Sequence, residues 1–293
     1  VEKAFDTFLR DPRFDGQPLQ LSIDLTVQSA LEEALYGGTR LMNAKGASAV
    51  LMDAYSGEVV SLSSLPDFDP NNRPRPLTKG DASDSALFNR AVQGVYELGS
   101  AFKAFTVAQA MDLGLVEPGS MVDTKGPLRW GKHKINDYRD YGAQMSVEKV
   151  LIKSSNIGTA RLSLMIGADL QKDFLDRLGL LQATPIEVIE GPTGRPQYPK
   201  NWSDISTMTI SYGHGISTSP VHLAAGYAAM VNGGTLVQPT VLKQPSAQLG
   251  ERIISEETSR HLRGMMRRVV TEGTARMGDV PGYSVAGKTG TAD

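Results

Sequence analysis

Three short motifs hold the residues of this chain whose types and spacing suggest chemistry. Ser100 lies three residues before Lys103, and further along come Ser154-Ser155-Asn156 and Lys288-Thr289-Gly290. A serine hydroxyl is a weak nucleophile near neutral pH and needs a base within hydrogen-bond reach. On a helix, side chains at positions i and i+3 share one face, so Lys103 can reach the Ser100 oxygen. The first motif therefore predicts a nucleophile with its own base.

For Lys103 to act as a base, its pKa must lie well below about 10.4, the ordinary value for lysine. Burial in the apolar helix that contains Phe102 and Phe105 would lower this pKa, because an apolar environment disfavours the charged amine. A second cation nearby would act in the same direction, and Lys288 is the candidate. Ser100 at a helix start also lies beside free backbone N–H groups, which can stabilise an oxyanion.

The other two motifs predict a proton relay and a carboxylate site. Ser154 would relay protons, and Asn156 would hold a substrate amide or a lysine. The third motif combines the charge of a lysine with two hydroxyls that bind a carboxylate and a glycine that lets another backbone approach closely. Its residues are Lys288, Thr289, Gly290 and Thr291.

Each motif also has a structural interpretation. Ser-x-x-Lys is common by chance, and we interpret its second copy, Ser146 to Lys149, as a helix cap followed by a solvated lysine. Serine and asparagine between two helices usually cap them, and a lysine at the end of a strand is usually solvated. The occurrence of all three motifs in one order, which is known from serine acyl-transfer enzymes, favours the chemical interpretation.

The composition excludes several classes of protein. The chain has 293 residues, a hydrophobic fraction of 40%, a formal net charge of -2 and no cysteine. The balanced charge argues against a nucleic-acid partner, and the missing cysteines exclude disulfides and cysteine-ligated metal. The histidines are scattered without metal-like spacing, and we interpret His214 as structural. No metal and no cofactor is predicted, and the sequence holds no run of about 18 apolar residues that would predict a membrane helix.

The apolar periodicity predicts an α+β domain in which helices cover a sheet. Asp24 is the expected cap of a helix that Gly37-Gly38 would end. The expected strands are Leu19–Ile23, Ala47–Asp53, Glu58–Ser63 and Tyr283–Ala286, and the expected helices include Ser100–Leu113, Val221–Asn232 and Ser255–Thr271. Further helices should precede and follow the Ser-Ser-Asn turn, while residues 65–85 and 181–206 should be connections.

The chain resembles the penicillin-binding transpeptidases, and more narrowly the class B, division-specific septal peptidoglycan D,D-transpeptidases of the FtsI type. Beyond the three motifs, the resemblance rests on segments spread from Val1 to Asp293. They are Val1-Glu2-Lys3-Ala4-Phe5-Asp6, Leu21-Ser22-Ile23-Asp24, Ala49-Val50-Leu51-Met52-Asp53, Ser56-Gly57-Glu58-Val59, Asp69-Pro70-Asn71-Asn72, Asn89-Arg90, Trp202-Ser203-Asp204-Ile205 and Ser211-Tyr212-Gly213-His214-Gly215. The implied fold is the one that penicillin-binding proteins share with serine β-lactamases, an antiparallel sheet flanked by helices.

The resemblance implies a role for each motif residue. Ser100 would attack the penultimate D-Ala carbonyl of a peptidoglycan stem peptide, with Lys103 as general base, and an amine of a neighbouring stem would resolve the acyl-enzyme. The relay pair would be Ser154 and Asn156. Carboxylate binding would fall to Lys288, Thr289 and Thr291 beside Gly290, with the backbone N–H groups of Ser100 and Thr291 as the oxyanion hole. β-Lactams would acylate the same serine.

The resemblance also sets expectations about the ends of the chain. Residues 1–20 should be the remnant of an N-terminal pedestal or linker, and residues 21–293 the transpeptidase domain without its last two strands and final helix. Without them, the sheet should have a gap and the Lys288 strand should be poorly supported. The parent protein should be held by an N-terminal helix at the periplasmic face of the inner membrane and should meet other division-machinery membrane proteins.

Two alternatives to the transpeptidase stay open. The first is a serine hydrolase with the same motifs, a D,D-carboxypeptidase or β-lactamase, in which water resolves the acyl-enzyme. The sequence shows no glutamate in an obvious position for a deacylation base, which disfavours the β-lactamase. The second is an inactive fragment that serves as a binding or structural module. Asp137 and Tyr138, in the connection before Ser146, are further candidates for lining the cleft.

Overall fold

The structure, a computed structural model, describes residues 1–292 and combines helices with antiparallel strands, as the α+β class predicts. The α-helices are α1 (Asp6–Arg10), α2 (Leu25–Leu41), α3 (Lys103–Asp112), α4 (Val147–Lys153), α5 (Asn156–Ile166), α6 (Ala168–Arg177), α7 (Asp204–Ser211), α8 (Pro220–Val231) and α9 (Glu256–Glu272). The strands are β1 (Ala47–Met52), β2 (Val59–Leu65), β3 (Met121–Asp123), β4 (Leu128–Trp130), β5 (His133–Ile135), β6 (Gln144–Ser146), β7 (Thr235–Val237) and β8 (Leu249–Arg252).

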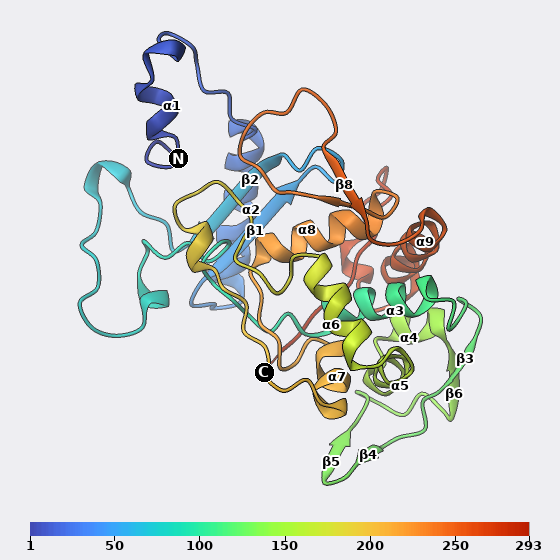
Figure 1. Ribbon diagram of the computed structural model, residues 1–293. Helices are drawn as coiled ribbons and strands as arrows, with labels where there is room; N and C mark the ends of the chain where they lie inside the picture. Colours follow the sequence, from blue (N-terminus) through green and yellow to red (C-terminus); the bar gives the residue numbers. More distant parts are fainter. Residues whose placement is uncertain (293) are drawn as a thin grey trace.

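Strands β1 and β2 form an antiparallel hairpin that lies between two helices. Residues of β2 alternate between buried and half-buried positions, the period of two that a strand with one covered face requires. Helix α2 packs mainly against β2, and α8 packs against β1, which gives three layers at this side of the molecule (Figure 1). The small pairs β3–β6 and β4–β5 lie at the far side from α1, beyond the helices.

Helix α2 begins where the sequence predicts and ends later. One carboxylate oxygen of Asp24 accepts hydrogen bonds from the N–H groups of Thr26 and Val27, at 2.9 and 3.1 Å, as an N-cap does. The prediction that Gly37-Gly38 ends the helix is wrong, because α2 runs on to Leu41. A glycine costs a helix about 1 kcal/mol without blocking its hydrogen bonds, so packing against the hairpin can carry the helix past two of them.

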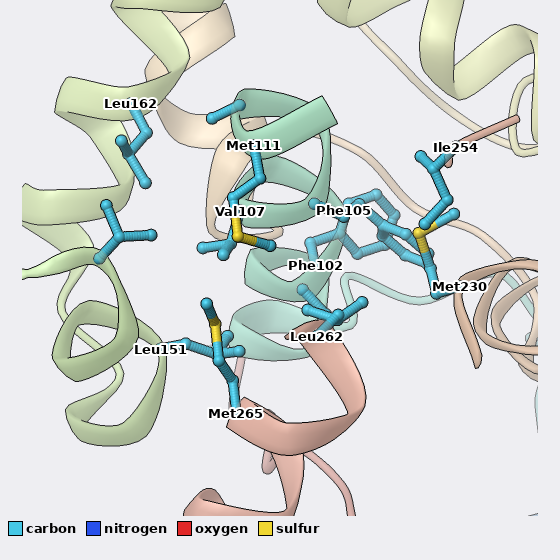
Figure 2. Close-up of a cluster of buried hydrophobic side chains, with 14 of the residues drawn as sticks. Phe102, Phe105, Val107, Met111, Leu151, Leu162, Met230, Ile254, Leu262 and Met265 are labelled. Atoms are coloured by element: carbon cyan, nitrogen blue, oxygen red, sulfur yellow. The ribbon is translucent and has the colours of Figure 1, made fainter. Parts of the chain in front are cut away.

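The main hydrophobic core surrounds α3. Every residue of α3 from Lys103 to Met111 is buried, and the apolar ones contact side chains of α4, α5, α8 and α9 (Figure 2). Phe105 is central, since its ring meets those of Phe102 and Tyr227 edge to face, each with centroids 5.4 Å apart. Full burial of one such side chain stabilises a fold by about 1.5–3 kcal/mol. The start of α3, which carries two of the motif residues, is therefore fixed from several sides.

Two expected strands are absent from residues 1–292. Within Leu19–Ile23 the backbone makes only an isolated bridge, between Leu21 and Leu242. Tyr283–Ala286 begins in a bend and then runs extended without pairing. Alternating or apolar sequence permits a strand, but a ladder also needs a neighbour in register, and local sequence does not supply one.

An open, largely apolar cavity of about 850 Å³ lies between β1, helices α8 and α9, and the extended segment at Ser284 and Ala286. Within the described part of the chain, β1 pairs with β2 alone. None of the described helices is both long and apolar enough to span a bilayer. The predicted domain boundary between residues 20 and 21 stays a prediction. The last residue of the predicted transpeptidase domain, Asp293, lies outside the described residues.

Candidate active site

Ser100 lies in a 3₁₀ turn, Gly99–Phe102, that leads directly into α3. The sequence predicted one continuous helix from Ser100, whereas the regular helix begins at Lys103. The tighter turn keeps the serine and the lysine on one side, and Lys103 Nζ lies 2.9 Å from Ser100 Oγ. The predicted proximity of nucleophile and base is thus observed.

Lys103 is fully buried and surrounded by oxygen atoms. Its Nζ lies 2.7 Å from the carbonyl oxygen of Ser154, 3.0 Å from Ser154 Oγ and 2.6 Å from Asn156 Oδ1, besides the contact with Ser100. The pKa of Lys103 is lowered to about 7, mainly by burial and also by the charge of Lys288, while the charge of Asp137 acts to raise it. Near neutral pH a large fraction of this amine is therefore free of its extra proton.

Three of the four oxygen contacts of Lys103 match the two donors and the one lone pair of a neutral amine. The carbonyl of Ser154 and the Oδ1 of Asn156 can only accept hydrogen bonds. A neutral amine has two N–H groups for these two acceptors and one lone pair left over, which can face the hydroxyl of Ser100. The orientation of the Asn156 amide is set by its Nδ2, which donates to the carbonyl of Asn136 at 3.0 Å. In this arrangement the neutral amine of Lys103 can accept the proton of the Ser100 hydroxyl.

The Ser154-Ser155-Asn156 motif forms the sharp turn between α4 and α5. Ser154 ends α4 in the left-handed conformation, with φ 61° and ψ 44°, which L-residues rarely adopt. Ser155 caps α5 by accepting a hydrogen bond from Gly158 N at 2.9 Å. The left-handed residue turns both the carbonyl and the hydroxyl of Ser154 toward Lys103. The capping that we weighed as an alternative is thus present at Ser155, while its neighbours face the site.

Lys288 approaches the same turn from the opposite side, although its segment belongs to no sheet in residues 1–292. Its Nζ lies 2.9 Å from Ser154 Oγ and 2.9 Å from the carbonyl oxygen of Thr289. Burial lowers the pKa of Lys288 to about 8. The side chain of Thr289 exchanges a hydrogen bond with that of Thr274 at 2.7 Å, so one predicted carboxylate ligand has a protein partner here.

Backbone contacts bring three separate segments together beside Ser100. Gly99 has a positive φ of 53°, and a Cβ added there would overlap the carbonyl oxygen of Thr291. A Cβ on Gly213 would overlap Gly99 in turn, and one on Gly290 would overlap the carbonyl oxygen of Leu98. Within residues 1–292, neither the N–H of Ser100 nor that of Thr291 donates a hydrogen bond. Both N–H groups are therefore candidates for the oxyanion hole that the sequence predicts.

The structure gives each of the other candidate residues from the sequence a distinct environment. Ser146 caps α4 by accepting from Lys149 N at 3.3 Å, and Lys149 is exposed, so this second Ser-x-x-Lys is the structural copy that we expected. Tyr138 is 96% exposed and makes no hydrogen bond with a motif residue in the described chain.

His214 lies between Gly213 and Gly215, in a turn that reaches the site, because Gly213 contacts Gly99. The Nδ1 of His214 is buried and has no hydrogen-bond partner in residues 1–292.

Asp137 has a more definite place than the sequence indicated. Its carboxylate accepts from Ser155 Oγ at 2.7 Å and from the N–H groups of Asn156 and Ile157 at 2.5 and 3.0 Å. Sequence reasoning put Asp137 near the cleft but did not find this role. An aspartate before a serine-rich helix start was the available signal, yet its distance along the chain from Ser155 hid the contact.

The chain matches the family model described as penicillin binding protein transpeptidase domain over residues 47–293. That match covers most of the chain and all three motifs. The chain belongs to the penicillin-binding protein transpeptidase family. Members of this family act on peptidoglycan and bind β-lactams. The family and the transpeptidase fold expected from the sequence are confirmed, while the absence of the last two strands and the final helix stays a prediction.

Similar proteins and structures agree with this assignment. The chain is 37% identical to "Probable peptidoglycan D,D-transpeptidase FtsI" of Caulobacter vibrioides over 299 residues, which cover 100% of the chain and 49% of that protein. It is 32% identical over 275 residues to "Peptidoglycan D,D-transpeptidase FtsI" of Escherichia coli K12, covering 94% of the chain and 45% of that protein. The apo structure of the TP domain from Burkholderia pseudomallei penicillin-binding protein 3 superposes with a TM-score of 0.81 at 32% identity, covering 92% of this chain and 76% of that one. The chain spans about half the length of the curated relatives it matches.

Proposed function

We propose that this chain carries the acyl-transfer site of a serine D,D-transpeptidase that cross-links peptidoglycan stem peptides in septal cell-wall synthesis. The observation that supports it most is the position of Lys103 Nζ, between Ser100 Oγ at 2.9 Å and Ser154 Oγ at 3.0 Å. A buried amine with a pKa of about 7 in that position can take a proton from one hydroxyl and return it through the other.

The first half-reaction would form an ester on Ser100. Its Oγ attacks the carbonyl carbon of the penultimate D-Ala while its proton moves to the neutral amine of Lys103. The oxyanion that forms is stabilised by the N–H groups of Ser100 and Thr291. When the peptide bond breaks, the departing amine of the terminal D-Ala takes a proton that Ser154 delivers from the Lys103 and Lys288 side. Free D-Ala leaves and the stem remains bound through an acyl bond.

The second half-reaction would transfer the acyl group to an amine. An amine of a neighbouring stem loses a proton to the same relay, attacks the ester carbonyl and forms the cross-link, which restores the Ser100 hydroxyl. Lys288, with the hydroxyls of Thr289 and Thr291 and the close backbone at Gly290, would hold the carboxylate of the substrate. Asn156 would hold Lys103 and a substrate amide. β-Lactams would acylate Ser100 by the first half-reaction and stay bound.

The proposal extends to the setting of the whole protein. Two relatives at 32–37% identity are named FtsI, which supports a place at the periplasmic face of the inner membrane and in septum formation. Other membrane proteins of the division machinery would then be partners. We likewise propose that residues 1–20 are the remnant of an N-terminal pedestal or linker and that the transpeptidase domain begins at residue 21; the family match, residues 47–293, lies within this domain.

Acylation at Ser100 is the direct test. Intact-mass measurement after incubation with benzylpenicillin should show one added mass in the wild type and in Ser146→Ala, and none in Ser100→Ala. Peptide mapping should place the adduct on Ser100. A folded wild type without an adduct would contradict the proposal and favour a binding module.

Acceptor choice separates the transpeptidase from a hydrolase. With a D-Ala-D-Ala stem peptide and a D-amino acid as added amine, a transpeptidase should release D-Ala and form the exchanged peptide. Release of D-Ala with only the hydrolysed peptide would indicate a carboxypeptidase. Rapid, repeated turnover of a chromogenic cephalosporin would indicate a β-lactamase.

A further inference from the structure

The carboxylate of Asp137 lies directly behind the turn that faces Lys103. It accepts three hydrogen bonds, from Ser155 Oγ, Asn156 N and Ile157 N, at 2.7, 2.5 and 3.0 Å. All three donors belong to the Ser-Ser-Asn turn or to the first residues of α5. None of the hydrogen bonds of Asp137 within residues 1–292 goes to Ser100, Lys103 or Lys288, so Asp137 acts on the site only through this turn or through its charge.

We propose that Asp137 is a positioning residue of this site, whose carboxylate holds the Ser154–Asn156 turn in the geometry that presents its oxygens to Lys103. This inference rests on the proposed acyl-transfer function. The turn needs such support because Ser154 has a left-handed backbone, a conformation unfavourable for a residue with a Cβ. Two successive N–H groups that bind one carboxylate oxygen fix the chain immediately after that residue.

The position of Asp137 also links the turn to its own loop. Asn136, the preceding residue, accepts a hydrogen bond from Asn156 Nδ2 through its carbonyl at 3.0 Å. This bond orients the amide so that Oδ1 faces Lys103, at 2.6 Å. The pair Asn136 and Asp137 therefore sets both the backbone and the side chain of Asn156. A shift of the loop would move the oxygens around Lys103 together.

Charge is the second contribution of Asp137. The charged groups that act on Lys103 are Lys288, which lowers its pKa, and Asp137, which raises it. Lys288 comes from the C-terminal segment, and Asp137 comes from the loop before β6. Asp137 thus opposes the effects of burial and of Lys288. Removal of its charge should lower the pKa of Lys103 and leave the amine neutral at a lower pH.

The test measures the second-order rate constant of acylation by a fluorescent penicillin as a function of pH. Asp137→Asn keeps the shape but removes the charge, so the rate constant should fall about tenfold to a hundredfold. The acid limb of its profile should move to lower pH, because Lys103 loses its proton more readily. Ser155→Ala removes the bond to Asp137 and the cap of α5 but no charge, so it should lower the rate without moving the limb. Asp140→Asn, in the same loop and exposed, should leave both unchanged.

Far-UV circular dichroism and thermal melting establish that each variant folds. If Asp137→Ala fails to fold, the nearly isosteric Asp137→Asn still decides the question. A folded Asp137→Asn with the wild-type rate constant, or with an unmoved acid limb, would overturn the inference. A wild type that is never acylated at Ser100 would instead refute the proposed function, so the two failures are distinguishable.

Discussion

Lys103 and Lys288 share one hydroxyl, since the Nζ atoms of both lie within 3.0 Å of Ser154 Oγ. Two cations this close would repel each other, and burial disfavours charge on either one. Burial and, to a lesser extent, the charge of Lys288 lower the pKa of Lys103 to about 7, and burial lowers the pKa of Lys288 to about 8. Ser154 can therefore pass protons between two amines that both titrate near neutral pH.

The acylation rate should follow a bell-shaped pH profile. Lys103 must be neutral to accept a proton, so the rate should rise with pH through about 7. Lys288 must be charged to hold a carboxylate, so the rate should fall as pH rises through about 8. Stopped-flow acylation by a fluorescent penicillin between pH 5 and 10, at roughly constant ionic strength of about 0.15 M, measures both limbs. A flat profile across this interval would show that neither amine has the proposed role.

Lys103→Gln should lower the acylation rate constant by about 10²–10⁴-fold, because a glutamine amide can donate hydrogen bonds but cannot act as a base. Lys149→Gln is the matched control, since Lys149 occupies the same place in the second Ser-x-x-Lys and is exposed. Its rate constant should equal that of the wild type. An equal effect of the two substitutions would mean that loss of charge, not loss of the base, lowers the rate.

Gly99→Ala should abolish acylation, whereas Gly114→Ala should not. Both glycines have positive φ, 53° and 67°, so each alanine should cost about 1–2 kcal/mol of stability. Only at Gly99 would the new Cβ overlap Thr291, while at Gly114 nothing lies within 4 Å. Covalent labelling and urea denaturation of both variants separate these effects. Full labelling of folded Gly99→Ala would show that the close approach to Thr291 is dispensable.

Phe105→Ala should lower the free energy of unfolding by about 3–5 kcal/mol, because Phe105 is 1% exposed and its cavity would lie in the middle of the core. Phe14→Ala provides the comparison, since Phe14 is 37% exposed and its ring stacks on Phe8 and lies under the Arg13 guanidinium, outside the main core. Its cost should be about 1 kcal/mol. Urea denaturation followed by tryptophan fluorescence measures both. Similar losses would mean that the core around α3 tolerates a cavity.

The sequence predicted those elements whose signals are local. Asp24, the apolar run Val221–Asn232 and the turn at Ser154 each mark an element through their neighbours, and each prediction held within a few residues. The strands at Leu19–Ile23 and Tyr283–Ala286 did not form, because pairing depends on distant backbone. The short pairs β3–β6 and β4–β5 were missed for the same reason, since three residues carry too little periodicity to detect.

For the site as well, the sequence predicted what local motifs encode and missed what depends on distant contacts. The residue types and their order predicted which side chains would meet, and Ser100, Lys103, Ser154, Asn156 and Lys288 do lie together. Their catalytic roles stay predictions. The part that the sequence did not reveal is carried by groups without a motif, namely the carboxylate of Asp137 and the backbone at Gly213. The sequence position of neither residue indicates which segment it contacts.

The contact of Gly99 with Thr291 and Gly213 involves only main-chain atoms, and this has an evolutionary consequence. Side chains along the cleft can change without entering this contact, because the atoms that meet at Gly99 belong to the main chain. Variants that exclude an inhibitor while keeping the natural substrate should therefore arise at lining side chains, and rarely at these glycines. The cleft can diversify its selectivity around an unchanging reactive centre.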